Sequence, residues 1–417
     1  MAQLSDDCFA FNGPLMSVDD AVTIIAARVT AVGETEDVDL LHADGRILAT
    51  DVVAPLPLPP FTNSAVDGYA VRYADLGTAD STLPVSGRVQ AGSASQQPLA
   101  ARHAMRIFTG APMPEGADTV FMQEDVQLDS AGNALLPQGL KAGANVRPAG
   151  EDVAKGMAAL PTGLRLRPQD VALIAAFGLT KVKVRRRIRV AVFSTGNELV
   201  SPGASLKAAQ QFDSNRFMLM ALLSRLGCSV ADLGIITDDR ALLAAALKDA
   251  AGAHDLILTS GGVSTGEEDH VKSAVESVGS LVLWRMAIKP GRPVAMGIID
   301  GTPVIGLPGN PVASFVTFAH VVRPAVFALA GAVPQKMNAM PVRAAFSYKK
   351  KIARREYVRV SLRHGAEGVL EAVKFPREGA GLLSSLVETE GLVELDEQTT
   401  QVSPGDLVGF LSYGLLW

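Results

Sequence analysis

Apolar and polar positions follow two different periods along this chain, and the change of period separates its large units. Between residues 188 and 331, short β-branched apolar runs alternate with stretches of helical spacing. Strands separated by helices of this length are typical of a doubly wound α/β sheet with parallel strands. The expected strands are 188–194, 230–236, 256–259, 281–288, 294–299 and 304–307, and the expected helices are 213–226, 240–251, 271–278 and 311–330.

The segments on either side of this region have other patterns. Residues 17–29 predict a helix, because Ser17 and Asp20 form a capping-box pair ahead of a one-sided apolar face. Short β-like runs between turns predict an all-β region over 69–143, and β structure returns from 340 onward, with a final strand pair around the turn 403–405. A short helix is expected over 168–177. The basic stretch KVKVRRRIR (181–189) keeps strand alternation, which favours a solvated strand face over a nucleic-acid site.

Composition narrows the class of protein. With 417 residues, 48% of them hydrophobic and 19% charged, the chain predicts an ordered, globular protein of three or four domains. Its net charge of −5 gives no general attraction to nucleic acid or to an anionic membrane. Two cysteines, Cys8 and Cys228, cannot build a disulfide framework, and no signal peptide or membrane span is evident. We therefore expect a soluble, cytoplasmic protein.

Three loops of the α/β region carry the candidate chemistry. They are STGNEL (194–199), TSGGVSTGEED (259–269) and GLPGNPVAS (306–314), and each follows an expected strand. Ligands of open α/β sheets bind outside the carboxyl ends of the strands, where glycine-rich loops and helix starts offer backbone N–H groups to anions. Pro311 stands where the last helix would begin. The three loops together predict a phosphorylated ligand.

Carboxylates at the same strand ends suggest a divalent cation. Glu198, Asp238, Asp239 and Asp269 could hold Mg²⁺ through one or two oxygens and water. For Asp238 and Asp239, helix capping is an equally good interpretation. Lys289, in AIKPGRP, suits a phosphate or an oxyanion; a solvated turn lysine is the alternative, but Pro290-Gly291 fixes the turn rather than leaving it loose.

Seven motifs occur in one order along the chain: NSAVDGYAV, TGAPMPEGADTV, RPAGEDV, FSTGNELV, TSGGVSTGEED, AIKPGRP and GLPGNPVAS. In this combination the sequence strongly resembles the molybdopterin molybdenumtransferases, the MoeA family that includes the gephyrin E-domain. The resemblance implies an elongated homodimer of multidomain α/β and β subunits. The implied domains are a discontinuous small α/β domain (14–40 plus 148–187), a β-rich domain (41–147), a doubly wound molybdopterin-binding domain (188–335) and a C-terminal β-barrel (336–417).

The family resemblance also implies an activity. Its members take adenylylated molybdopterin and molybdate, cleave the phosphoanhydride with Mg²⁺, and release AMP and molybdenum cofactor. The molybdopterin adenylyltransferase and cofactor acceptor proteins are the implied protein partners. Two alternatives are an adenylyltransferase, which resembles the α/β domain alone, and a molybdopterin-binding scaffold without turnover.

Residue roles follow from the matching motifs. By spacing alone Asp67 is a turn aspartate, but the resemblance makes it an acidic residue that reaches the cleft of the partner subunit. The implied metal ligands are Glu198, Asp238 and Asp269, which with Asp67 and Lys289 make up the implied catalytic set. The implied substrate-binding residues are Thr109, Arg147, Asp152, Thr195, Gly196, Ser260, Gly261, Gly262, Ser264, Arg285, Pro308, Gly309, Asn310, Pro311, Ser314 and Arg359. Two departures from the family pattern are Arg285, where a lysine is frequent, and Ala380, where a serine is frequent.

Overall fold

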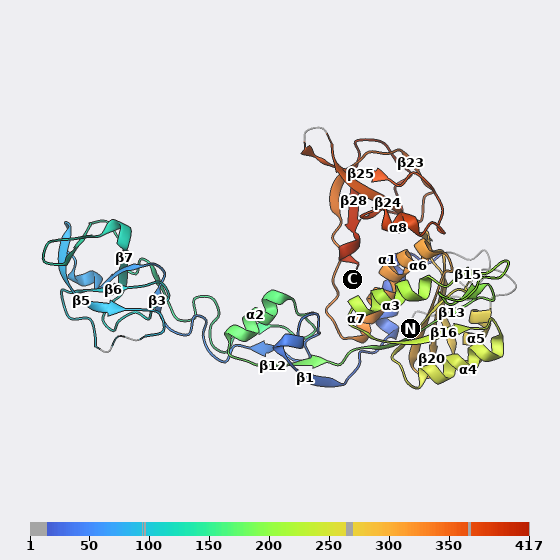
Figure 1. Ribbon diagram of the computed structural model, residues 1–417, viewed down its shortest axis with the longest axis horizontal. Coiled ribbons are helices and arrows are strands. Elements are labelled where there is room, and N and C mark those ends of the chain that lie inside the picture. The colour runs from blue at the N-terminus through green and yellow to red at the C-terminus, as the bar shows by residue number, and fades with distance from the viewer. Residues whose placement is uncertain (1–14, 94, 96, 264–269, 366–367, 417) are drawn as a thin grey trace.

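The computed structural model describes residues 15–93, 95, 97–263, 270–365 and 368–416. The chain is elongated, with a β-rich unit at one end, a small unit in the middle, and an α/β unit carrying a β-barrel at the other end (Figure 1). The middle unit contains segments from both sides of the β-rich unit in sequence, so the chain runs out to the β-rich unit and returns.

The α/β unit is built on a six-stranded sheet of order β16-β13-β17-β21-β20-β18. The first four strands run parallel, as their alternation with helices predicts, and the last two run antiparallel to their neighbours. The bounds are β13 Arg189–Thr195, β16 Ser229–Ile236, β17 Leu256–Ser260, β18 Ser280–Arg285, β20 Pro293–Ile299 and β21 Thr302–Leu307.

The antiparallel strands correct the expectation of a wholly parallel sheet. β20 and β21 form a hairpin whose turn is Asp300-Gly301, and both turn residues have positive φ, 47° and 87°. An Asp-Gly pair between two apolar runs favours such a two-residue turn, which returns the chain beside the strand that it has just left. The expected strand 281–288 is also divided, because β18 ends at Arg285 and a separate short strand, β19 (Ile288–Lys289), follows.

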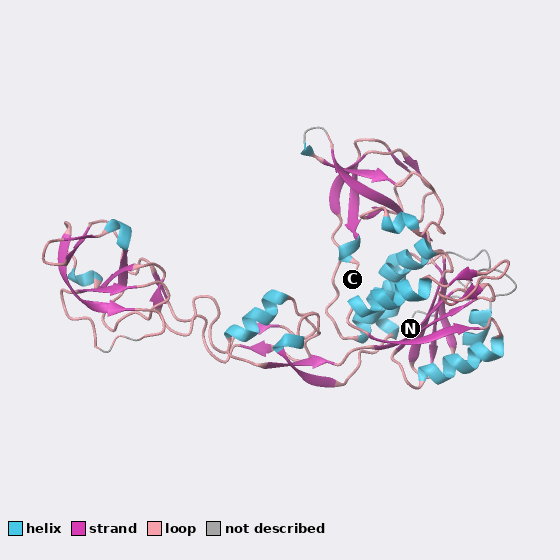
Figure 2. Cartoon of the chain, viewed as in Figure 1, coloured by secondary structure: helices cyan, strands magenta, loops and turns pink. Residues whose placement is uncertain are grey.

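Helices cover both faces of this sheet (Figure 2). One face packs against α1 (Val18–Arg28), α3 (Asn215–Arg225), α6 (Pro311–Thr317) and α7 (Arg323–Leu329), and the other against α4 (Arg240–Ala251) and α5 (His270–Val278). A π-helical turn, Phe318–Val322, joins α6 to α7. In the described parts of the chain, the continuous segment Pro311–Leu329 alone has the length and apolar character of a membrane span, and it is 89% buried, as a core helix is.

The middle unit pairs β1 (Thr35–Asp39) with β12 (Lys181–Arg185) and β2 (Val52–Val53) with β11 (Ala158–Leu160), beside α2 (Pro168–Ala176). Its core includes Ala43, Leu48 and Val52. Because these side chains pack with residues 153–184, we propose that the chain leaves the middle unit near residue 60 rather than at 41.

The β-rich unit has the strand order β7-β4-β6-β5-β9-β8. The bounds are β4 Gly68–Val71, β5 Ser81–Val89, β6 Ala104–Ile107, β7 Thr119–Met122, β8 Gln127–Leu128 and β9 Asn133–Leu136. A separate pair, β3 (Asn63–Ser64) with β10 (Val146–Arg147), closes the base of the unit where the chain enters and leaves. The predicted all-β region is present.

The C-terminal unit is a five-stranded barrel. Pairings run β24-β25-β22-β28-β26 and return from β26 to β24, which closes the sheet. The bounds are β22 Met340–Ala344, β24 Arg355–His364, β25 Leu370–Lys374, β26 Gly391–Leu395 and β28 Leu407–Ser412. The expectation of a final strand pair is wrong: β27 (Gln401–Val402) pairs with β23 (Tyr348–Lys349), whereas β28 enters the barrel.

The barrel is attached to the α/β unit by a strand and by ion pairs. β19 leaves the α/β unit and pairs in parallel with β24. Arg355 bridges the two units, with its guanidinium 2.8 Å from Asp19 on α1 and 3.1 Å from Glu397. These contacts fix the face of the barrel that looks onto the sheet.

Candidate functional site

The three predicted loops meet at one edge of the sheet. Ser260 is the register partner of Ser194 on one side and of Leu307 on the other, so the carboxyl ends of β13, β17 and β21 lie next to one another. The N–H of Gly261 donates to the carbonyl of Leu307 at 3.0 Å, which ties the second loop to the third. This arrangement is the one expected for an anion site at the end of a parallel sheet.

The start of the central loop approaches the end of β13 too closely for a side chain. A Cβ atom on Gly261 would lie 2.3 Å from the carbonyl oxygen of Thr195, and one on Gly262 would lie 2.8 Å from the Thr195 methyl carbon. Both glycines have positive φ, 93° and 63°. Glycine is therefore required at both positions, because a side chain at either would overlap the end of β13.

Asn215 links two of the loops through its side chain. Its sequence pattern indicated only the start of a helix, so it was not predicted as a site residue. Its side-chain amide donates to Ser260 Oγ at 2.9 Å and to the Gly309 carbonyl at 2.7 Å. Asn215 Oδ1 and Ser314 Oγ are buried and have no hydrogen-bond partner among the described residues. Buried polar atoms of this kind are available to a ligand or to ordered water.

The neighbouring acids Asp238 and Asp239 have different surroundings, which separates their two interpretations. Asp239 caps α4, because Oδ1 accepts from the N–H groups of Ala241 and Leu242 at 2.9 Å each. Asp238 instead accepts from Thr195 Oγ1 at 3.4 Å, at the strand end. Asp239 is thus the capping residue, and Asp238 lies beside the loops.

Glu198 folds back over its own loop. A Cβ atom on Gly196 would lie 2.7 Å from Glu198 Oε2, so the carboxylate covers the backbone that follows β13. Glu198 and Asp238 therefore both contact the segment Thr195–Gly196. Ser264 and Asp269, the other predicted members of this cluster, lie outside the described residues, and the described part of the chain contains no group of three potential metal ligands.

A buried ion pair supports this edge of the sheet. Arg216 lies 2.8 Å from Asp213, and the two side chains are 5% and 1% exposed. Arg216 also pairs with Asp232, and Ser194 Oγ donates to Asp213 at 3.1 Å. The pair joins the start of α3 to the end of β13 and so holds the loop that carries Glu198.

Lys289 and Arg359 line one pocket between the α/β unit and the barrel. The pocket has a volume of about 360 Å³, and Pro308 and Asn310 of the third loop form part of its wall. Its lining contains five cations and one acid: Lys289, Arg292, Arg359, Lys374, Arg377 and Glu378. Glu378 pairs with Lys374 at 3.0 Å, which leaves the pocket positively charged overall. The sequence did not point to Lys374 or Arg377.

Lys289 reaches the pocket from β19, which pairs with the barrel rather than with the α/β sheet. Its Nζ atom donates to the Tyr348 hydroxyl at 3.1 Å and lies 3.3 Å from Glu356. Burial alone would lower the pKa of Lys289, but the Tyr348 hydrogen bond and the Glu356 charge outweigh it and raise the pKa above its usual value. Lys289 is therefore a fixed cation and not a loose turn lysine.

Arg359 lines the same pocket from β24. It donates to the Gly379 carbonyl at 3.0 Å and to Ser385 Oγ at 2.5 Å, and it lies over the Phe375 ring. Burial lowers the pKa of Arg359, although a guanidinium remains charged. Arg285, by contrast, ends β18 opposite Pro293 and is not among the residues that line the pocket.

Ala380 contacts the third loop through its backbone. Its carbonyl accepts from the N–H of Val312 at 3.0 Å, in the first turn of α6 behind Pro311. The sequence predicts that the first amides of this helix face the ligand. In the structure this amide is already bonded to the barrel, so fewer N–H groups remain for an anion.

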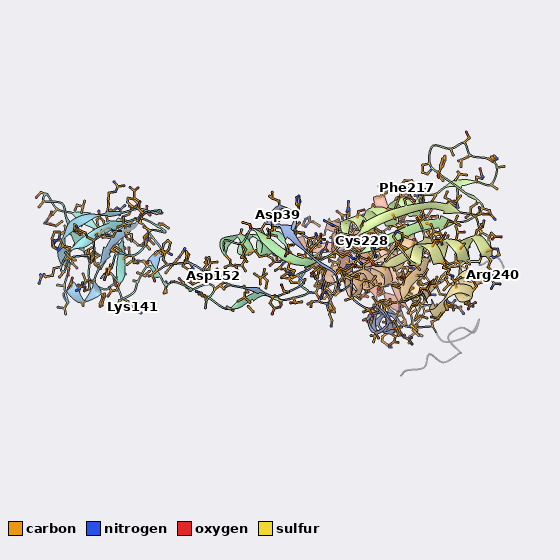
Figure 3. All side chains as sticks on the ribbon, turned by 90° about the horizontal axis from the view of Figure 1, so that it is seen from below. Asp39, Lys141, Asp152, Phe217, Cys228 and Arg240 are labelled. Carbon is orange, nitrogen blue, oxygen red and sulfur yellow. The ribbon has the colours of Figure 1, made fainter. Side chains whose placement is uncertain are left out.

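Asp67 and Thr109 lie together in the β-rich unit. Asp67 Oδ1 accepts from the Thr109 N–H at 2.8 Å and from its hydroxyl at 2.7 Å, and these two bonds lower the pKa of Asp67. Arg147, on β10, is exposed. Asp152 lies in the narrow stretch between the β-rich and middle units (Figure 3). Within one chain the β-rich unit lies at the other end of the molecule from the α/β unit and the barrel (Figure 1), whose residues line the pocket.

Comparison with known sequences agrees with these units. The MoeA N-terminal region (domains I and II) matches residues 16–178, a probable molybdopterin-binding domain matches 191–328, and the MoeA C-terminal region (domain IV) matches 341–413. The class of protein that the fold and site define is thus a multidomain enzyme of molybdenum cofactor biosynthesis.

Individual relatives specify the family. The chain is 38% identical to the molybdopterin molybdenumtransferase of Haemophilus influenzae, over 94% of this chain and 98% of the relative, and 36% identical to that of Nostoc, over 94% and 92%. A crystal structure of the Pyrococcus horikoshii MoeA protein superposes with a TM-score of 0.81 and 28% identity, over 96% of this chain and all of that one. The chain belongs to the MoeA family of molybdopterin molybdenumtransferases. The family resemblance drawn from the motifs is confirmed.

Proposed function

We propose that this transferase inserts the metal of molybdate into adenylylated molybdopterin, cleaving the phosphoanhydride in a Mg²⁺-dependent step and releasing AMP and molybdenum cofactor. The observation that carries the proposal is the junction of two kinds of anion site. Three loops that contain glycine lie at one sheet edge, and Asn310 of the third loop also lines a pocket with five cations.

The loops and the pocket suit different parts of the substrates. The backbone at Gly261 and Gly262, with Thr195, Ser260 and the third loop, would hold the phosphate and pterin. Lys289 and Arg359, which both line the pocket, would hold the oxyanion. Molybdate is an oxyanion, so cations and N–H donors suit it better than sulfur or imidazole ligands.

Glu198 and Asp238 are the described residues that fit Mg²⁺. Both offer hard oxygen ligands at the same strand end, and Mg²⁺ commonly uses one or two carboxylates together with water and substrate phosphates. We infer that Asp269 completes the set. Bound Mg²⁺ would neutralise charge that develops on the phosphates.

The attacking group is an oxygen of molybdate or of water. Among the described residues lining the pocket there is neither a cysteine nor a histidine to serve as a covalent nucleophile or its base. The oxygen forms a new bond to the phosphorus on the pterin side of the anhydride while the bond from that phosphorus to the bridging oxygen breaks, and AMP departs with the bridging oxygen and the electron pair. Lys289 would stabilise the entering anion.

We further propose a homodimer in which Asp67 of one subunit, with Thr109, Arg147 and Asp152 nearby, faces the loops of its partner. The distance between these groups within one chain supports a shared site (Figure 1). We place the reaction in the cytoplasm, with the molybdopterin adenylyltransferase as donor and cofactor-dependent enzymes as acceptors.

The decisive experiment incubates the protein with adenylylated molybdopterin, Mg²⁺ and molybdate and follows AMP release and cofactor formation. Molybdate-dependent release of AMP at the rate of cofactor formation is expected. An adenylyltransferase would instead make adenylylated molybdopterin from molybdopterin and ATP, and a scaffold would bind molybdopterin without turnover. Either result overturns the proposal.

A further inference from the structure

A buried carboxylate, that of Glu356, lies next to the Lys289 ammonium. Glu356, on β24, is 1% exposed. It is the register partner of Lys289 where β19 pairs with β24, so the two backbones fix its place relative to the lysine. A carboxylate this deeply buried is costly unless several donors satisfy it.

Three side chains satisfy Glu356, and they form a closed set around Lys289. Oε2 accepts from the Tyr348 hydroxyl at 2.7 Å and lies 3.3 Å from Lys289 Nζ, while Oε1 accepts from Arg354 at 2.6 Å. Lys289 Nζ in turn donates to the Tyr348 hydroxyl at 3.1 Å. The tyrosine oxygen thus accepts from the lysine and donates to the glutamate.

We propose that Glu356 and Tyr348 are positioning residues, which fix the place and the charge of the Lys289 ammonium at the wall of the anion pocket. The inference rests on the proposed function only in taking an anion as the ligand of that pocket. A lysine has a flexible four-carbon stem and three donors. Two of the donors are directed at Tyr348 and Glu356, and the side chain is still 46% exposed, so the ammonium keeps donor capacity for a ligand.

The depth of Glu356 matters as much as its charge. A carboxylate exposed in the pocket would repel an anion, whereas Glu356 is not among the residues lining the pocket and Tyr348 is. Tyr348 therefore shields the negative charge while it transmits its attraction to Lys289. Burial and the Glu356 charge raise the pKa of Tyr348, so its hydroxyl stays neutral and remains a donor.

Tyr348 also orders a second cation on the same wall. The ammonium groups of Lys289 and Lys374 lie 5.6 Å and 5.8 Å from the centre of its ring. An aromatic ring attracts cations at this distance. One tyrosine consequently brings together two ammonium groups, which would otherwise repel each other.

The first test measures Lys289 itself and needs no activity. Only the neutral amine reacts with an acetylating reagent, so the acetylation rate at pH 9, followed by mass spectrometry, reports how firmly Lys289 is held as a cation. Relative to exposed Lys248 in the same sample, the rate should rise about fivefold or more in Glu356→Gln and in Tyr348→Phe, as expected for loss of a charge-assisted bond. Tyr413→Phe, which removes a hydroxyl bonded to Thr389 in the same barrel, should leave it unchanged.

The second test separates positioning from general damage. Tyr348→Phe should raise the molybdate concentration for half-maximal cofactor formation about fivefold and change the maximal rate less than twofold. In a Lys289→Ala background the same substitution should have no further effect. Unchanged acetylation of Lys289 in folded Tyr348→Phe and Glu356→Gln, or additive effects in the double variant, would overturn the proposal. If the native protein releases no AMP, the proposed function fails while the acetylation test still decides the role of Glu356.

Discussion

The position of each residue at the candidate site depends on how the units of the chain pack and pair. Lys289 is supplied by β19 and Arg359 by β24, and the pocket between them exists only because the barrel packs against the α/β unit. Asp238 and Asp239 are neighbours in sequence, yet one faces Thr195 and the other caps α4. Residue type alone therefore does not set the role of a side chain here.

Lys289 should select the oxyanion. Replacing it by alanine should weaken molybdate use more than molybdopterin binding, because the glycine-rich loop would still hold the pterin phosphate. Lys289→Arg should rescue only in part, since a planar guanidinium cannot take the place of a compact ammonium. The measurement is the molybdate concentration for half-maximal cofactor formation, beside a direct titration of molybdopterin. Weaker pterin binding with an unchanged molybdate requirement would make Lys289 a pterin or phosphate ligand.

The two acids at the loops should be needed for chemistry and not for folding. Glu198→Gln and Asp269→Asn keep side-chain size and remove charge, so each should slow anhydride cleavage by at least about a hundredfold while circular dichroism and melting temperature stay close to native. Asp239→Asn is the matched control, because it alters a helix cap in the same edge of the sheet. AMP release near the native rate in both variants would remove them from the metal site.

The meeting of the three loops was predictable at this scale, because each loop follows the end of a strand in a parallel sheet. The loops at Thr195, Ser260 and Leu307 are adjacent, as that rule requires. Tyr348 and Glu356 were missed because they approach Lys289 through the pairing of β19 with β24. No local pattern records a contact between strands of different units.

At the scale of helices and strands, the bounds of an element were predictable where a local pattern determines them. The direction of a strand was predicted wrongly where a turn or a tertiary pairing determines it. The helices over α1, α2 and α4 begin and end within a residue or two of their expected positions, since caps and periodicity determine them. The Asp300-Gly301 turn reversed β20 against the expected direction, although its two residues carry a hairpin signal. The expected helix 311–330 is present but contains the π-helical turn Phe318–Val322.

His320 lies in this π-helical turn and should make the free energy of unfolding depend on pH in the acid range. The imidazole is 4% exposed and stacks 4.2 Å from the Tyr357 ring. Burial, aided by the positive charges of Arg355 and Arg323 and opposed by Asp19, lowers the pKa of His320 to about 3. In the unfolded chain His320 binds a proton near pH 6.5. The contribution of neutral, buried His320 to the unfolding free energy is therefore fully present above that pH and declines as the pH falls toward 3.

Protonation of His320 in the unfolded chain should lower the unfolding free energy by ~2 kcal/mol when the pH falls from 7 to 5. Replacing His320 by phenylalanine keeps an aromatic ring beside Tyr357 and removes the titrating group. Urea unfolding at the two pH values should then show that the unfolding free energy of the variant falls by about that amount less than the unfolding free energy of the native protein. The matched control is His42→Phe, which makes the same change of side chain at an exposed position. An equal loss in native protein and His320→Phe would show that His320 does not titrate on unfolding.

At the scale of the whole molecule, the two candidate clusters lie in different units, at opposite ends of the chain (Figure 1). Asp67 and Thr109 are in contact at one end of an elongated chain, and Glu198, Asp238 and the pocket are at the other (Figure 1). The motifs placed all of them in one function. The resemblance implies that Asp67 serves the cleft of a partner subunit, and the fold of a single chain, which keeps the two clusters apart (Figure 1), is consistent with that proposal.

A shared site can be tested by mixing two inactive proteins. Asp67→Ala and Glu198→Ala each disable both sites of their own homodimer, but a mixed dimer would contain one site with neither substitution. If subunits exchange freely, an equimolar mixture forms about half mixed dimers, and recovery of about a quarter of native activity is expected, since half of the sites in those dimers are intact. Mixing Glu198→Ala with Asp238→Ala is the matched control, because both changes lie at the same end of the chain. If both acids of a site come from one subunit, each site of a mixed dimer carries one of the two substitutions, and no activity should return. Mixing Asp67→Ala with Thr109→Ala tests the other end in the same way. Mass spectrometry of differently labelled subunits would verify exchange. A strictly monomeric protein, or proven exchange without recovery in the first mixture, would show that Asp67 does not serve the site of a partner subunit.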